Sequence, residues 1–198
     1  MKFIVNFFII LTFSSCAAWR LNDSDKIVTF PKEMQLKEKV ALAVDFKEYQ
    51  VFYNGEMKQD KINDQKKLEI KELILKAYEE SDLFKLVPKG KATYIAEINL
   101  TQKGIGSMNQ AILTGLTLFL YPSKSTDEFT ITTIFKNQKN EVQAEFTKSD
   151  TVIMWKQLFL IFALPFKYPY KELKNVVIDL NRATILDAYH EPFLQPEL

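Results

Sequence analysis

The sequence predicts an α+β domain, with an antiparallel or mixed sheet and helices packed mainly on one face of it. Two observations carry this prediction: apolar and polar residues alternate in several segments, and other segments place apolar residues three and four positions apart. The chain of 198 residues is 47% hydrophobic and 26% charged. This composition is typical of a folded protein with one core, and it excludes a disordered or low-complexity chain.

Alternation of apolar with polar side chains identifies the expected strands. It is found over Val40–Phe46, Tyr49–Tyr53, Tyr94–Leu100, Phe129–Phe135 and Val142–Phe146. Asn54-Gly55 predicts a turn after the second of these segments, and Asn137–Asn140 predicts the turn of a hairpin between the last two. Gly104–Ser107 is expected to be a flexible break, and not a phosphate loop, because no Lys-Ser or Lys-Thr pair follows it.

Two segments have the apolar spacing of an amphipathic helix. The first is Lys66–Ser81, and Asp64 is placed to cap its N-terminus. Its apolar stripe consists of Ile70, Leu73, Ile74, Ala77 and Tyr78. The second is Lys171–Tyr189, which has a comparable face that begins at Leu173.

Two further segments are almost wholly apolar but too short to span a membrane. Ala111–Tyr121 is expected to be either a buried strand or a short core helix. Val152–Leu164 is expected to be a helix, which either covers one face of the sheet or presents apolar area to a membrane or a protein partner. Under the second alternative, that surface consists of Trp155, Leu158, Phe159, Phe162 and Phe166.

The N-terminus has the organisation of a secretory signal peptide. Lys2 supplies a positive charge, and Phe3–Phe13 form an apolar segment. The small residues Ser14 and Ser15 then precede Cys16, the only cysteine of the chain. The apolar segment is too short for a transmembrane helix, and a single cysteine excludes a disulfide within the chain.

Cys16 and the residues before it resemble the lipobox of bacterial lipoproteins. Phe13 takes the place of the usual leucine, as in the relaxed lipobox of some Gram-negative groups, especially the spirochaetes. The resemblance implies that Cys16 is acylated and that its lipid holds the mature chain to a membrane of the cell envelope, with the outer membrane as the expected one. Whether the periplasmic or the external face carries it stays open. We therefore divide the chain into a signal peptide (1–15), the lipidated cysteine with a tether (16–37), one α+β domain (38–191) and a C-terminal tail (192–198).

The predicted elements from Val40 to Leu100 follow the order strand, long helix, strand. The helix ends in Ser81-Asp82-Leu83-Phe84, and the second strand is entered through Ala92-Thr93-Tyr94. This order resembles the core of periplasmic lipoproteins that serve as accessory or assembly subunits, such as the curli-secretion and transport-auxiliary types. The later part of the chain resembles uncharacterised bacterial lipoproteins. The resemblance implies a fold and a compartment, but a fold alone does not assign a function.

These observations favour a non-enzymatic lipoprotein that acts as an accessory or scaffold subunit, with a membrane and an envelope protein as partners. Two alternatives stay open: a carrier of lipid or a small apolar ligand, in a pocket between the sheet and the Phe-rich helix at 152–164, and a surface adhesin. We expect no catalytic residue, metal ligand or cofactor, because the single histidine, His190, has no nucleophile or metal-ligand pattern around it. The net charge of +1 gives no reason to expect a nucleic acid.

Overall fold

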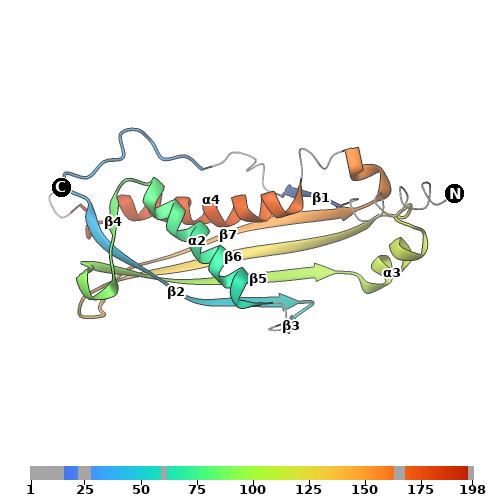
Figure 1. Ribbon diagram of the computed structural model, residues 1–198, viewed down its shortest axis with the longest axis horizontal. Coiled ribbons are helices and arrows are strands. Elements are labelled where there is room, and N and C mark those ends of the chain that lie inside the picture. The colour runs from blue at the N-terminus through green and yellow to red at the C-terminus, as the bar shows by residue number, and fades with distance from the viewer. Residues whose placement is uncertain (1–15, 22–27, 59–61, 163–167, 196–198) are drawn as a thin grey trace.

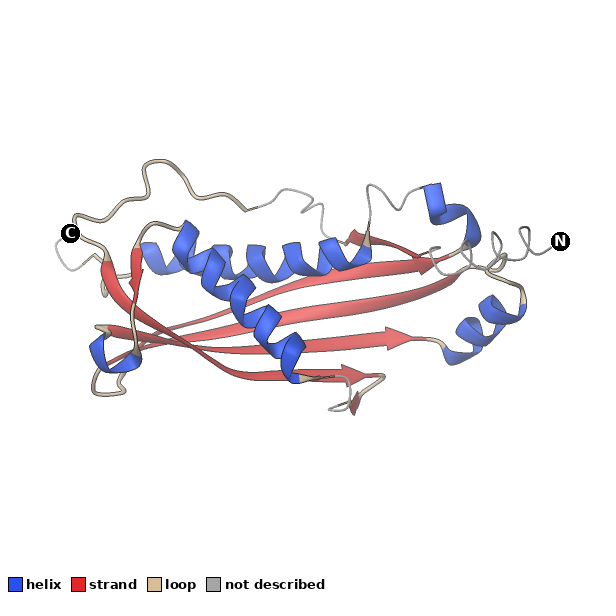
Figure 2. Cartoon of the chain, viewed as in Figure 1, coloured by secondary structure: helices blue, strands red, loops and turns tan. Residues whose placement is uncertain are grey.

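The structure is a computed structural model that describes residues 16–21, 28–58, 62–162 and 168–195. In this part of the chain, seven strands form one mixed sheet, and two long helices cover one of its faces (Figure 1 and Figure 2). This confirms the predicted fold class. The elements in chain order are β1 (Cys16–Arg20), β2 (Val40–Tyr53), β3 (Glu56–Met57), α2 (Asp64–Glu80), β4 (Phe84–Leu86), η2 (Lys89–Lys91), β5 (Tyr94–Gly106), α3 (Met108–Leu116), β6 (Ser123–Asn137), β7 (Val142–Lys156), η3 (Leu158–Phe162) and α4 (Pro169–Tyr189).

The strand order is β1-β7-β6-β5-β2-β3, and β4 pairs with β2 outside this path. β2 is parallel to β5 and β4, whereas the other neighbours are antiparallel, so the sheet is the mixed one of the two predicted alternatives. The connection from β2 to β5 contains α2, because parallel neighbours need a crossover from one end of the sheet to the other. α4 contacts β7, β6 and β1, and it packs against α2 on the same face.

The core lies between the sheet and the two long helices. On β6, Phe129, Ile131, Thr133 and Phe135 are buried, while the residues that alternate with them are partly exposed, as expected for a strand with one covered face. The stripe predicted on α2 is confirmed as part of the core, with Leu73 at its half-buried margin. The ring of Phe135 packs against that of Phe146 at a centroid distance of 6.0 Å.

The N-terminal cap of α2 is Asn63 and not the predicted Asp64. The Oδ1 atom of Asn63 accepts a hydrogen bond from the backbone N–H of Lys66 at 2.7 Å. This bond satisfies one of the N–H groups that a helix leaves unpaired at its start. Asp64 becomes the first residue of the helix, where its negative charge interacts favourably with the helix dipole.

Gly104 and Gly106 lie inside β5 and do not form the predicted flexible break. Their lack of side chains makes room for the ring of Tyr53 on the neighbouring strand. A Cβ atom at Gly104 would lie 2.9 Å from Tyr53 Cδ2, and one at Gly106 would lie 2.5 Å from Tyr53 Oη. The carboxamide of Asn54 also accepts from the N–H and donates to the C=O of Gly106, both at 3.0 Å. The two glycines therefore allow a close contact between β2 and β5.

The helix predicted for Val152–Leu164 is wrong. Its first residues, as far as Lys156, continue β7, and Leu158–Phe162 form the short 3-10 helix η3, while 163–164 lie outside the described residues. β7 pairs with β6 on one side and with β1 on the other, so two ladders of backbone hydrogen bonds hold its end extended. A strand between two neighbours has the same apolar composition as a buried helix, which is why periodicity did not separate them.

The predicted C-terminal tail at 192–198 begins inside the fold. Leu194 is buried, and the ring of Phe193 packs against that of Phe135 at a centroid distance of 5.3 Å. Residues 196–198 lie outside the described part of the chain.

Candidate functional site

Cys16, the predicted lipidation residue, is the first residue of β1. It lies opposite Lys156 on β7, which in turn lies opposite Ser123 on β6. The tether predicted at 16–37 therefore begins inside the sheet and not outside the domain. Burial raises the pKa of the Cys16 thiol above its ordinary value, and the positive charge of Lys156 offsets part of this effect. These three residues form one row across an end of the sheet, which we call the Cys16 row.

Four residues after Cys16, a buried ionic cluster fastens β1 to the rest of the fold. Arg20 donates from Nε to Asp150 on β7 and from Nη1 to Asp179 on α4, both at 2.6 Å. The three side chains are 5%, 6% and 2% exposed. Burial disfavours the charge of Arg20, but the hydrogen bonds and the two carboxylates outweigh it and raise its pKa further above the ordinary value. The cluster holds the chain that follows Cys16 in a fixed place.

The surface predicted at 152–166 is present in part. Trp155 is the second-last residue of β7 and is 37% exposed, and Phe159 on η3 is 63% exposed. Leu158 is half-buried, and its N–H donates to the carbonyl of Phe119 at 2.9 Å. Of the remaining two residues, Phe162 ends η3 and Phe166 lies outside the described residues. The structure therefore brings Trp155, Leu158 and Phe159 to the same end of the sheet as the Cys16 row (Figure 1).

The segment 111–121 forms most of α3 and the turn after it, but it is not the predicted core element. In α3 only Thr114 is buried, and Leu116 is 78% exposed. Among the described residues, ten of the sixteen exposed large hydrophobic side chains come from the end of β5, from α3 with the turn after it, and from the end of β7 with η3. We call these ten the apolar cap: Ile105, Met108, Ile112, Leu113, Leu116, Leu118, Leu120, Tyr121, Trp155 and Phe159.

The sequence contains a signal for the apolar cap, although the apolar composition of 111–121 led to the prediction that this segment lies in the core. Residues 104–123 contain no Asp, Glu, Lys or Arg, in a chain that is 26% charged. Lys103 and Lys124 stand at the two ends of this uncharged run. A buried element of a small domain is commonly flanked by charge as well, so the exposure of the run follows from the tertiary structure and not from the pattern.

The turn after α3 has a strained backbone. Leu118 and Phe119 have φ angles of 49° and 65°, in the left-handed region that a bulky side chain rarely adopts. The N–H of Phe119 donates to the carbonyl of Thr114 at 2.8 Å, and the N–H of Tyr121 donates to the hydroxyl of Thr117 at 3.0 Å. These bonds keep the turn in one conformation, with Leu118 exposed. Backbone strain of this kind is typical of functional surfaces.

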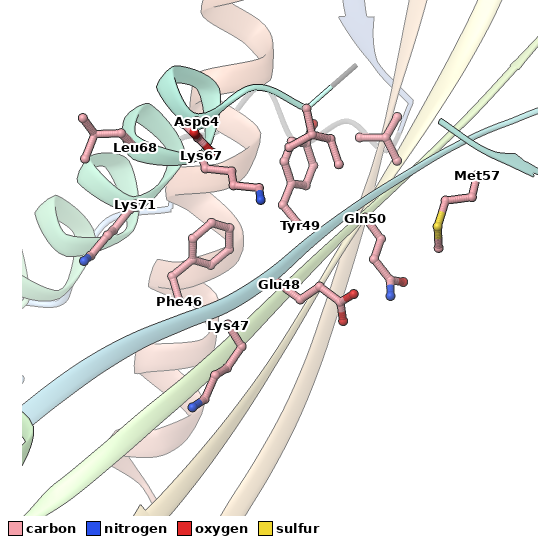
Figure 3. Close-up of a pocket in the computed structure, with 12 residues that line it drawn as sticks. Phe46, Lys47, Glu48, Tyr49, Gln50, Met57, Asp64, Lys67, Leu68 and Lys71 are labelled. Carbon is pink, nitrogen blue, oxygen red and sulfur yellow. The ribbon is translucent and has the colours of Figure 1, made fainter. Parts of the chain in front are cut away.

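A groove of about 440 Å³ lies between the start of α2 and the middle of β2 (Figure 3). Phe46 and Tyr49 line it from the strand, and Lys67 and Lys71 line it from the helix. Glu48 on the same strand carries the opposite charge. Both signs of charge therefore line this open groove.

A second pocket of about 310 Å³ lies on the other side of Tyr49, between α2, α4 and the sheet. Its walls are mostly apolar and include Leu73 of α2, Phe129 of β6 and Val177 of α4. At its mouth, Lys174 lies 2.8 Å from Glu69 and 4.3 Å from the ring centroid of Tyr170. Small-molecule sites are commonly apolar hollows with a few polar groups at one side, of about 300–1,000 Å³. This pocket is at the lower end of that range.

A chain of hydrogen bonds connects the apolar pocket to a buried carboxylate on β6. The hydroxyl of Tyr49 donates to Gln102 Oε1 at 2.5 Å, and Gln102 Nε2 donates to Asp127 Oδ1 at 2.8 Å. Burial raises the pKa of the Tyr49 hydroxyl, and the carboxylate of Asp127 raises it further. No local sequence pattern predicts this arrangement, because its members come from the three strands β2, β5 and β6.

Other chemical features are few in the described part of the chain. His190 follows the last residue of α4 and is exposed. No group of His, Cys, Asp and Glu among the described residues is placed to hold a metal ion. No described helix combines the length and the apolar character that crossing a bilayer requires.

Three bacterial proteins are among the solved structures that align with this chain. A homologue of neuraminyllactose-binding hemagglutinin from Helicobacter pylori aligns over 77% of this chain and 82% of its own, with 9% identity and a TM-score of 0.42. A minor lipoprotein from Acinetobacter baumannii aligns over 81% and 95%, with 6% identity and a TM-score of 0.40. A Xanthomonas campestris protein of the DUF330 family aligns over 82% and 94%, with 10% identity and a TM-score of 0.41. No family model and no curated protein sequence matches the chain.

Proposed function

We propose that this chain is an envelope lipoprotein, held to a membrane by acyl chains on Cys16, which serves as a non-enzymatic accessory or scaffold subunit. The observation that carries the proposal is the position of the only cysteine. Cys16 follows an apolar signal-like segment in the sequence and begins a strand at the end of the sheet where exposed apolar side chains gather. Two or more acyl chains on one cysteine hold a protein stably to a bilayer.

The sheet face without the long helices supports the subunit role. It presents ordered polar side chains, which suit a reversible contact with another protein. Lys136 and Glu97 form an ion pair across β6 and β5 at 2.5 Å, and the hydroxyls of Thr132 and Thr147 are 3.3 Å apart across β6 and β7. A pre-ordered surface loses little side-chain entropy on binding.

Replacing Cys16 by serine is expected to abolish acylation. Cells that express the full chain and receive labelled palmitate should incorporate the label into the unaltered protein and not into Cys16→Ser, because serine has no thiol for the acyl transfer. The serine variant should also accumulate with residues 1–15 still attached. Ser15→Ala keeps a small residue before the cysteine and serves as the matched control, which should be labelled normally. Equal labelling of Cys16→Ser and the unaltered chain would contradict the proposed anchor.

A separate experiment on the same membranes tests the proposed subunit role. After extraction in mild detergent, native mass spectrometry should find the acylated chain in a complex of fixed stoichiometry with an envelope protein. An acylated chain that is monomeric and alone after extraction would contradict the subunit role and would leave the anchor intact.

The apolar pocket beside Tyr49 favours a second function, a carrier of a single-chain lipid. The predicted pocket beside a Phe-rich helix does not exist, because that helix is absent from the described structure, but α2 and α4 enclose one with the sheet. Its apolar walls suit an acyl chain. Lys66 and Lys174 also line it, and they suit a carboxylate head group.

Filling this pocket tests the carrier function. Leu73→Trp is expected to lower the affinity for a dansyl-labelled fatty acid by about tenfold or more, or ~1.4 kcal/mol, because the indole occupies the space of the acyl chain. The measurement is fluorescence titration of the full chain. Leu68→Trp, on the same helix but exposed outside this pocket, is the control. Binding that Leu73→Trp leaves unchanged would contradict the carrier function.

A further inference from the structure

The apolar cap lies at the same end of the sheet as Cys16. Two members of the Cys16 row connect it to the apolar cap. Ser123 begins β6 after the turn that follows α3, and Lys156 ends β7 shortly before η3. The turn after α3 and the start of η3 are joined by the hydrogen bond from Leu158 to Phe119. Two chain segments that are distant in sequence thus meet beside the residue that would carry the lipid (Figure 1).

The position of Cys16 is fixed relative to the apolar cap. β1 is paired with β7 over its whole length, and Arg20 binds buried carboxylates on β7 and α4. An acyl chain on Cys16 therefore brings the domain itself to the bilayer surface, without an intervening flexible linker. The part of the domain that arrives there first is the end with the Cys16 row and the apolar cap.

The backbone of α3 is suited to an apolar medium. The hydroxyl of Thr114 donates to the carbonyl of Gln110, and that of Thr117 donates to the carbonyl of Leu113, both at 2.8 Å. These are internal partners for groups that would otherwise need water. Polar groups without such partners oppose entry into lipid, so their satisfaction removes the main obstacle.

The charges around the apolar cap fit a lipid surface. Lys103 and Lys124 bound the uncharged run 104–123, and Lys156 ends β7 two positions before the start of η3. Long cationic side chains at the margin of an apolar surface reach lipid phosphates while their stems stay in the apolar region. The cation of Lys124 lies 6.0 Å from the ring centroid of Trp155, and tryptophan is enriched at the same depth of a membrane.

We propose that the apolar cap inserts into the interfacial region of the leaflet that holds the Cys16 lipid, as a second membrane contact formed by α3, its turn and η3. The proposal rests on the proposed acylation for its geometry. The occupant of the cap is the lipid bilayer, because the cap combines an uncharged apolar surface, lysines at its margin and a tryptophan beside the lipid attachment point. The role of Cys16 is attachment, and the role of the cap is to set the orientation of the domain.

The chain contains a built-in reporter for this contact. It has two tryptophans, Trp19 and Trp155, so Trp19→Phe leaves Trp155 as the only one. The acylated full chain with Trp19→Phe is reconstituted into phosphatidylethanolamine–phosphatidylglycerol vesicles with or without bromine on the acyl chains. We expect bromine to quench Trp155, because the indole lies within reach of the lipid chains.

A charge in the apolar cap should remove the quenching. Leu116→Asp, at the most exposed large apolar side chain of α3, is expected to lower the quenching of Trp155 by about half or more, because aspartate is excluded from the apolar part of a leaflet. Leu68→Asp on α2 is the matched control: Leu68 is 57% exposed, as is Leu120 of the cap, and it is outside the cap. The control should leave the quenching unchanged, and circular dichroism should show both variants to be folded.

Two readouts separate this inference from the proposed anchor. Palmitate labelling reports acylation, and vesicle flotation reports attachment, whereas bromine quenching reports insertion of the cap. A labelled protein that floats with vesicles while its Trp155 is not quenched would overturn the inference and leave the anchor intact. The same holds if Leu116→Asp releases an envelope protein from the chain without any quenching of Trp155 in protein-free vesicles, because the cap would then bind protein. An unlabelled chain with a quenched Trp155 would support the cap and contradict the anchor.

Discussion

Replacing Arg20 by methionine is expected to lower the free energy of unfolding by ~3–5 kcal/mol, the usual cost when one partner of a buried ion pair is removed. The variant keeps an apolar stem of similar length but leaves the carboxylates of Asp150 and Asp179, 6% and 2% exposed, without the cation that they share. The measurement is urea unfolding of the full chain, followed by circular dichroism.

Two comparisons separate charge from size in this experiment. Lys39→Met removes the cation of an exposed pair with Asp82 and should cost less than ~1 kcal/mol. Adding Asp150→Asn and Asp179→Asn to Arg20→Met should restore part of the lost stability, because the two buried charges are then removed. If Arg20→Met costs no more than Lys39→Met, the cluster does not fasten β1 to the fold.

Truncating Phe135 to alanine is expected to cost ~3–5 kcal/mol, the range for large aromatic side chains in a core. Phe135 is fully buried on β6, and its ring connects Phe146 of the neighbouring strand with Phe193 beyond the end of α4. The same urea measurement applies. The loss of the contact with Phe193 should also make the chain after α4 more sensitive to protease than in the unaltered protein.

Ile134→Ala is the matched control for this prediction. Ile134 is the neighbouring residue of the same strand, but it points to the opposite face and is partly exposed. Its truncation should cost less, about 1 kcal/mol, because the residual cavity is open to water. Equal costs for the two variants would mean that the core does not lie on the helix-covered face at this position.

Local patterns predicted the elements that have one covered and one open face. The alternation on β6 and the stripe on α2 are properties of a single element against a single core, and they agree with the structure. Patterns failed at the end of β7, because a segment between two neighbouring strands is apolar in the same way as a buried helix. They failed at α3 as well, because composition describes how apolar a segment is and not whether anything covers it.

The same contrast between local patterns and long-range contacts applies to the candidate site. The lipidation of Cys16 stays a prediction, and it could be made from the sequence because the residues that indicate it are contiguous. The ionic cluster could not, because Arg20 is 130 residues from Asp150 and 159 residues from Asp179, and no local rule connects residues at such separations. The exposed cap could be found only in part: Trp155 and Phe159 were candidates, whereas Leu116 and Leu120 were assigned to a core.

The pairing of β1 with β7 places Cys16 at one end of the longest strands of the sheet. β6 and β7 have 15 residues each and extend from the Cys16 row to the hairpin turn between them. At ~3.3 Å per residue, their hairpin turn stands up to ~50 Å from that row. Under the proposed acylation of Cys16, this length would set the distance from the bilayer at which the hairpin turn could contact another protein. Flexible residues inserted directly after Cys16 would separate the lipid from the paired part of β1, and the distance between the bilayer and the hairpin turn would then no longer be fixed.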